Sequence, residues 1–139
     1  MADEDNLWTA ASDGDVGRVI ELLDSGAHAV DDADDSGYTC LHAAASYSHR
    51  GLIEALIARK ANVHAVDDEG ETPLHVCEDT DTAKLLIAAG ADAAKLNTLG
   101  QTAEDRAREE DFPILADFLA TLAGPAETAV EASTKKAKR

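Results

Sequence analysis

The sequence predicts an all-α repeat solenoid, a stack of about four helix-turn-helix units joined by β-turn fingers. A Thr-x-Leu-His motif occurs at Thr39–His42 and again 33 residues later at Thr72–His75, an interval that indicates a structural repeat. Gly37 and Gly70 precede the two copies at the same interval. Aromatic residues make up only 4% of the chain, and alanine and leucine supply most of the apolar residues. This composition favours closely packed helices over sheets.

The motif copies divide the chain into one repeat domain, expected at 1–124, and a tail. Residues 125–139 are small, polar and charged, so we expect a disordered tail with a basic end. The end at 135–139 is either a nuclear-import signal or a segment that folds back onto the acidic body. We expect the first and last repeats to act as polar caps, because a stack must present a hydrated face at each end. The four repeats are expected at about 5–36, 37–69, 70–99 and 100–124.

The residues within each unit support helices with defined starts. Thr72 is a suitable N-cap, and Pro73 suits the first helical position, where its missing N–H has no cost. His75 can return a hydrogen bond to the cap, as in a capping box. Gly70 stands where a tight turn needs a positive φ. In the segments that follow the motifs, apolar residues recur three and four positions apart, which predicts a second helix with one buried stripe.

Two segments carry the hallmark residues of a known family. Gly70-Glu71-Thr72-Pro73-Leu74-His75 and Gly90-Ala91-Asp92 resemble the ankyrin-repeat family, and the resemblance covers about residues 5–122. It implies an ankyrin stack in which each unit is a β-turn followed by two antiparallel helices. The chain is similar to small stand-alone ankyrin-repeat proteins of fungi and other lower eukaryotes. In such proteins, partners contact the turn tips and the exposed sides of the first helices, which line the concave face.

Several positions depart from the family pattern. The first finger is one residue longer than the second, and the third repeat lacks three residues around 77–81, so we expect a tighter turn between its helices. In the last repeat, Ala103-Glu104-Asp105 replaces the Pro-Leu-His element. Trp8 is expected at the position of the motif histidine in the first repeat, packed against the core.

The charge of the chain is strongly acidic, with a formal net charge of −16. This charge disfavours direct binding of nucleic acid, because phosphate contacts need lysine and arginine, and it favours basic proteins. The alternative is that acidity only keeps the protein soluble and monomeric. No apolar stretch is long enough to span a membrane, and the acidic start is unlike a secretory leader. We therefore expect a cytoplasmic protein, which the basic end could also direct to the nucleus.

The sequence offers no pattern typical of an enzyme, a metal site or a cofactor site. Cys40 and Cys77 have no paired ligand spacing and are expected to be small buried thiols. His42 and His75 belong to the repeat motif, and no nucleophile elbow, zinc-protease motif or phosphate-binding loop occurs. We expect no catalysis, no metal and no cofactor.

The resemblance assigns partner contacts to the finger tips and the first helices. Acidic residues collect on the turns before the second and third repeats, and two tyrosines are the expected aromatic anchors. Aspartate also favours turns for local reasons, which gives the acidic tips a second explanation. The expected contact residues are Asp13, Asp34, Asp35, Tyr38, Tyr47, Asp67, Asp68, Glu69, Glu71, Asp79, Glu109 and Glu110.

Two functions are compatible with this pattern. The first is a non-enzymatic interaction module that binds a basic protein segment, such as part of a ribosomal or histone-like protein, as an escort or chaperone. The second is a regulatory or inhibitory subunit that docks on an enzyme. The first predicts that the acidic tips dominate binding, and the second that the tyrosines do.

Overall fold

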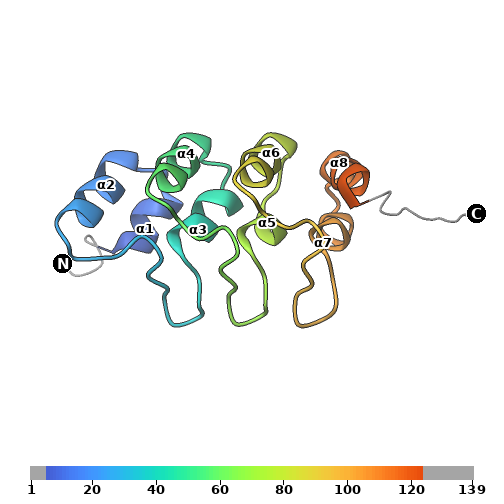
Figure 1. Cartoon of the computed structure of the whole chain (residues 1–139), viewed down its shortest axis with the longest axis horizontal. Helices are drawn as coiled ribbons and strands as arrows, with labels where there is room; N and C mark the ends of the chain where they lie inside the picture. The colour runs from blue at the N-terminus through green and yellow to red at the C-terminus, as the bar shows by residue number, and fades with distance from the viewer. Residues whose placement is uncertain (1–5, 124–139) are drawn as a thin grey trace, which may run out of the picture.

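The described part of the chain is built from helices in two layers. The computed structural model describes residues 6–123, in which eight helices and no strand occur. The first helices of the repeats lie in one row and the second helices in another, and the fingers project from the first row, away from the second (Figure 1). The all-α repeat solenoid predicted from the sequence is confirmed.

Each repeat contributes one pair of helices and is joined to the next by a finger. The tail expected at 125–139 lies outside the described residues. The first helices are α1 (Leu7–Ser12), α3 (Cys40–Ser46), α5 (Pro73–Val76) and α7 (Ala103–Glu109). The second helices are α2 (Val16–Asp24), α4 (Arg50–Ala58), α6 (Thr80–Ala88) and α8 (Pro113–Ala123). The fingers are 25–39, 59–72 and 89–102, and the first is one residue longer, as expected.

The two central repeats begin their first helices with a reciprocal cap that the motif supplies. The Thr39 hydroxyl accepts a hydrogen bond from the N–H of His42 (3.3 Å), and His42 Nδ1 accepts one from the N–H of Thr39 (3.2 Å). Thr72 and His75 form the same pair of bonds, at 3.4 and 3.1 Å. The predicted capping box is therefore confirmed. It satisfies two N–H groups that a helix start otherwise leaves unpaired.

The terminal repeats use other caps. In the fourth repeat Asp105 replaces the histidine and accepts from the N–H of Thr102 (3.0 Å). In the first repeat Asn6 is the cap, and its Oδ1 accepts from the N–H groups of Trp8 (2.7 Å) and Thr9 (3.1 Å). α1 begins one residue later than α3, but Trp8 and His42 both lie four residues before the last residue of their helix, so Trp8 occupies the position of the motif histidine as expected. Its Nε1 donates to the carbonyl of Asp32 in the following finger at 3.3 Å. Trp8 does pack against the core, as expected.

Neighbouring fingers are joined through their backbones at the glycine turns. The N–H of Asp68 donates to the carbonyl of Ser36 (2.8 Å), and the N–H of Thr98 donates to the carbonyl of Glu69 (2.9 Å). Gly70 has a φ of 74°, and a Cβ atom at this glycine would lie only 2.9 Å from the backbone nitrogen of Thr98. The turn therefore needs glycine both for its backbone conformation and for the close approach of the next finger.

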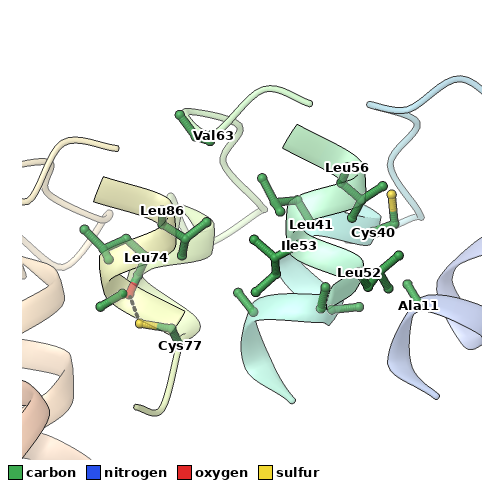
Figure 2. Close-up of a cluster of buried hydrophobic side chains, with 14 of the residues drawn as sticks. Ala11, Cys40, Leu41, Leu52, Ile53, Leu56, Val63, Leu74, Cys77 and Leu86 are labelled. Carbon is green, nitrogen blue, oxygen red and sulfur yellow. Dashed lines mark hydrogen bonds between the residues drawn. The ribbon is translucent and has the colours of Figure 1, made fainter. Parts of the chain in front are cut away.

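Small side chains let the first helices pack closely. Ala43, Ala44 and Ala45 are fully buried where α3 lies between α1 and α5. Large aliphatic side chains fill the space between the two helical layers, and burying each stabilises the fold by about 2 kcal/mol. Figure 2 shows this layer around Cys40, Leu41, Leu52, Ile53, Leu56, Leu74 and Leu86.

The third repeat is shortened in its first helix rather than in its turn. α5 has 4 residues, whereas α3 and α7 have 7 each. The turns at 47–49, 77–79 and 110–112 are equally long, so the expectation of a tighter turn is wrong. Cys77 adopts an extended backbone (φ −72°, ψ 157°) and ends α5 early. Its Sγ donates to the carbonyl of Leu74 at 3.2 Å (Figure 2). The row of first helices therefore lacks about one helical turn at α5.

Two glycine variants separate backbone strain from the contact between fingers. Gly100 has a φ of 77°, like Gly70, but no atom lies within 4 Å of the Cβ position. We expect Gly100→Ala to lower the free energy of unfolding by about 1 kcal/mol and Gly70→Ala to lower it by about 3 kcal/mol. Urea unfolding followed by circular dichroism measures both. Equal losses would show that the approach of the third finger does not constrain Gly70.

Candidate protein-interaction surface

The surface expected to meet a partner consists of the three fingers and the exposed sides of α1, α3, α5 and α7. We call this surface the finger face. It lies on the side of the stack away from the second helices (Figure 1). Its acidic residues divide into those that hold the structure together and those that point freely into solvent.

Two of the expected contact residues fold the fingers. Asp34 Oδ1 accepts from the N–H groups of Ser36 (2.8 Å) and Tyr38 (3.0 Å). Asp67 Oδ1 accepts from Glu69 (2.9 Å) and Glu71 (3.0 Å) in the same way. Such a side chain closes its own turn, so these two carboxylates already have structural partners. In the third finger, Asn97 Oδ1 makes the equivalent bonds to the N–H groups of Leu99 and Gln101, both at 2.9 Å.

The freely exposed carboxylates lie at the tips of the first two fingers. Asp35, Asp68 and Glu69 are exposed, and none of them forms an ion pair with another residue in the range 6–123. The backbone bond between Asp68 and Ser36 holds the two tips side by side. The three carboxylates therefore form one fixed acidic group, which we call the acidic tips.

The third finger has a different character. Leu99, at the tip where the family resemblance places partner contacts, is 81% exposed, and Leu96, which is not among the expected contact residues, is 53% exposed. Together with Glu69 and Asn97, Leu99 lines a hollow of about 180 Å³ between the second and third fingers. The finger face therefore passes from acidic tips to an apolar tip along the stack.

Glu71 is not an exposed contact residue, which corrects the expectation from the sequence. It is only 5% exposed, and its Oε2 accepts from Arg106 Nε (2.6 Å) and from the Asn97 amide (2.9 Å). Arg106 also binds Glu109 (2.9 Å) and Glu110 (3.0 Å) through Nη1. One guanidinium thus holds three carboxylates and joins the third repeat to the fourth.

The remaining acidic positions differ in how free they are. Glu109 and Glu110 are exposed but paired with Arg106. Asp79 caps α6, since its Oδ1 accepts from the N–H of Thr82 (3.2 Å). Asp13 follows α1 directly and its side chain is exposed.

The two tyrosines are placed differently. Tyr47 follows α3 and is 60% exposed, so it is accessible as an anchor. Tyr38 is half-buried, and its ring lies 5.1 Å from that of His42, centroid to centroid. Burial raises the pKa of the Tyr38 hydroxyl above its ordinary value of 10.0. Tyr38 forms part of the floor of the finger face.

The shortened α5 leaves a hollow in the finger face. This hollow of about 180 Å³ extends from Tyr38 and Ser46 in the second repeat to Arg106 and Glu110 in the fourth. His75 and Val76 at the end of α5, and Cys77 and Glu78 just after it, also line this hollow. Where α3 and α7 have a second turn, α5 has only one, and the missing turn opens this space.

Comparison with known proteins assigns the family. Residues 7–97 match the ankyrin-repeat family, in three copies. The chain belongs to the ankyrin-repeat family. This result confirms the resemblance seen in the sequence. Ankyrin repeats are protein–protein interaction modules and are generally non-enzymatic.

Curated relatives of this ankyrin chain include proteins of yeast and of mammals. An ankyrin repeat-containing protein of Schizosaccharomyces pombe is 41% identical over 116 residues, which are 82% of this chain and 56% of the yeast protein. BCL-6 corepressor-like protein 1 of Homo sapiens is 33% identical over 130 residues, 91% of this chain but 7% of the human protein. Protein phosphatase 1 regulatory subunit 27 of Mus musculus is 32% identical over 108 residues, 76% of this chain and 70% of the mouse protein. The chain thus spans little more than half of the yeast relative.

The nucleophilic groups of the ankyrin core are buried. Burial raises the pKa of both the Cys40 and the Cys77 thiol to about 12, so neither forms an appreciable thiolate at neutral pH. Burial lowers the pKa of His42 below its ordinary value of 6.5. In the part of the chain that the structure covers, no three metal-ligating side chains are grouped for an ion, and no helix is long and apolar enough to cross a membrane.

The pair between Glu71 and Arg106 predicts a measurable loss of stability. Arg106→Met leaves Glu71 buried with only an amide partner. Removing one partner of a fully buried pair costs 3–5 kcal/mol; because the Arg106 side chain is 20% exposed, we expect about 2 kcal/mol. Arg108→Met is the matched control, since Arg108 pairs with Glu104 at the surface, and should change stability little. Urea unfolding at neutral pH compares the two variants, and similar effects would contradict an internal role for Glu71.

His42 predicts a dependence of stability on pH. The folded pKa lies below the unfolded value of about 6.5, so the unfolded chain binds the proton more readily. The contribution of neutral His42 to the free energy of unfolding is therefore complete above about pH 6.5. It falls by at most about 1.4 kcal/mol per pH unit as the pH drops below this value.

The variant His42→Gln keeps a hydrogen-bond donor and an acceptor but cannot titrate. We expect the free energy of unfolding of the wild type to fall relative to this variant between about pH 6.5 and pH 5. Subtracting the free energies of unfolding of the two proteins at each pH cancels the effect of the many carboxylates, which both proteins share. Urea unfolding at a series of pH values measures both proteins. If their free energies of unfolding changed in parallel with pH, the lowered pKa of His42 would be refuted.

Proposed function

We propose that this chain is a non-enzymatic interaction module that binds a basic protein segment through its finger face. The observation that carries the proposal is the group of acidic tips, Asp35, Asp68 and Glu69, which are exposed and not paired with any described residue. The formal net charge of −16 adds a long-range attraction for a cationic partner.

The acidic tips are suited to steering a partner and fixing its orientation. Surface ion pairs each contribute only about 0–1 kcal/mol, but a row of like charges speeds the encounter with an opposite charge. Because the backbone bonds between fingers hold the tips in place, little ordering is needed on binding. Tyr47 and the hollow beside α5 then provide area for contacts that slow dissociation.

An escort or chaperone for a basic protein is the role that best fits this chemistry. Ribosomal and histone-like proteins are the basic classes to test. In this proposal the free chain is a monomer, since copies with this net charge repel each other. It acts in the cytoplasm or in the nucleus, without catalysis, cofactor or direct contact with nucleic acid.

A regulatory subunit that docks on an enzyme is the second candidate. It is supported by the similarity to a mouse protein named as a phosphatase regulatory subunit and by the exposure of Tyr47. This candidate requires that an aromatic anchor, rather than charge, dominates the binding energy.

Charge reversal at the acidic tips tests the first candidate. Asp68→Lys with Glu69→Lys should weaken binding of purified histones or ribosomal proteins at least about tenfold, because the steering charges change sign. The matched control is Glu54→Lys with Asp117→Lys, which alters net charge equally on the exposed sides of α4 and α8. Tyr47→Ala is tested in parallel.

Fluorescence anisotropy at low and at physiological ionic strength measures these affinities. The proposal is supported if binding to the wild type weakens with salt and the control variant, Glu54→Lys with Asp117→Lys, keeps its affinity. Equal losses of affinity in both double charge variants would show that the acidic tips act only through the net charge of the chain. A loss with Tyr47→Ala alone would favour the regulatory candidate.

A further inference from the structure

A second hollow lies on the side of the stack where the first helices end and the second helices begin. The fingers leave from the N-terminal ends of the first helices, so the turns from first to second helix, at 47–49, 77–79 and 110–112, lie at the opposite helix ends. We call this side the turn edge. Between the turns of the third and fourth repeats lies a hollow of about 340 Å³. It is lined by Glu78, Asp79, Thr80, Asp111, Phe112, Pro113, Ile114 and Leu115.

This hollow exists because the third and fourth repeats lack the bridge found between the second and third. There, Arg50 at the start of α4 binds Asp81, the second residue of α6, at 2.7 Å. The equivalent positions in the next pair of repeats are Thr80 and Ile114. These side chains cannot form an ion pair, and Ile114 is 77% exposed. An exposed isoleucine beside Phe112 and Pro113 gives the hollow an apolar floor.

The rim of the hollow is acidic. Glu78 and Asp111 are both exposed, and neither pairs with a cationic side chain anywhere in residues 6–123. Asp79 differs, because its carboxylate is used to cap α6. Two free carboxylates therefore border an apolar surface, an arrangement that complements a basic side chain next to an apolar one.

We propose that the turn edge binds a peptide segment of a protein partner in which a large apolar side chain is adjacent to lysine or arginine. The apolar side chain occupies the hollow against Phe112 and Ile114, and the basic side chain pairs with Glu78 or Asp111. This inference rests on the proposed function as an interaction module, but it places a contact on the edge that the acidic tips do not reach.

Charge argues for a basic partner over the other surfaces that could cover an apolar hollow. A second copy of this chain would bring the same carboxylates and a net charge of −16 into the contact. A membrane with anionic headgroups would be repelled for the same reason. A cationic peptide gains from both the apolar floor and the acidic rim.

The hollow lies next to the one in the finger face. Glu78 and Phe112 line both this hollow and the one beside the shortened α5. A segment bound to the finger face can therefore continue over the end of α5 and insert a side chain at the turn edge. The three residues missing from α5 open the first of these spaces, and the missing bridge opens the second.

Selection of peptides on the full chain tests the proposal. Random peptides displayed on phage are selected against the wild type, and those recovered are synthesised and measured by fluorescence anisotropy. We expect peptides that place Lys or Arg within two positions of Leu, Ile, Phe or Met. Ile114→Asn should lower the affinity of these peptides at least about tenfold. Glu78→Gln with Asp111→Asn should lower it at least about threefold.

Matched variants away from both proposed contact surfaces serve as controls. Leu122→Asn also replaces an exposed apolar residue of α8, and Glu54→Gln with Asp117→Asn also removes two exposed carboxylates. Both should leave the affinity of the selected peptides within about twofold. Thermal unfolding checks that each variant is folded.

Several results would overturn the proposal. If the selected peptides bind the Ile114→Asn variant as tightly as the wild type, the proposed site at the turn edge is excluded. If their affinity falls instead with Asp68→Asn and Glu69→Gln, the proposed function survives while this inference fails. A dimer in sedimentation that Ile114→Asn abolishes would make a second copy the occupant. Selection that succeeds only after deletion of residues 135–139 would make the basic end of this chain the occupant. Recovery of no peptide would count against both proposals.

Discussion

The rest of the stack depends on how the motif histidine is held between two repeats. In the second repeat, His42 Nδ1 accepts from the N–H of Thr39 at the start of its own helix, and its Nε2 lies 2.7 Å from the carbonyl of Glu71 in the next finger. A carbonyl can only accept, so Nε2 carries the proton and the ring is neutral. His75 makes the same connection to the carbonyl of Gln101 at 3.0 Å. One buried ring therefore fixes both the start of a helix and the position of the following finger, which explains why the finger tips keep a constant arrangement.

The ends of the stack follow from the same constraint. A carboxylate can return the cap bond, as Asp105 does to Thr102, but it has no N–H to donate to a further finger. The motif histidine reaches the finger that follows the second helix of its own repeat, and α8 is the last helix of the described residues. In the first repeat Asn6 caps α1, and Trp8 makes the link to the next finger, since its Nε1 donates to the carbonyl of Asp32 at 3.3 Å. Among the described repeats, the fourth keeps the cap without the link, and its polar first helix is able to face water.

The sequence predicts what is local and misses what depends on distant residues. The caps at Thr39 and Thr72 and the glycine turns involve neighbours a few residues apart, and spacing alone predicts them. Glu71 looks like a tip residue, but its partner Arg106 is 35 residues away, and no local pattern reveals that pairing. The turn role of Asp34 and Asp67 could have been found, because Asn97 occupies the same place in the third finger and an uncharged side chain there indicates a structural need. The gap in the third repeat was visible, but the number of missing residues does not say whether a helix or a turn loses them; that depends on how Cys77 packs.

The shortened α5 links these observations to function. A stack of identical repeats would present a continuous row of first helices and a continuous row of bridges like that between Arg50 and Asp81. Here the loss of one helical turn interrupts the row, and Ile114 interrupts the bridges one repeat further on. Both interruptions meet at Glu78 and Phe112, where the two hollows share their walls. The acidic tips are also bound to the third repeat through the Glu69 carbonyl, which accepts from the N–H of Thr98, so the least regular repeat of the stack borders each of the surfaces proposed here for a basic partner. A stack of identical ankyrin repeats would have neither interruption, so the binding surface proposed here depends on this one irregular repeat.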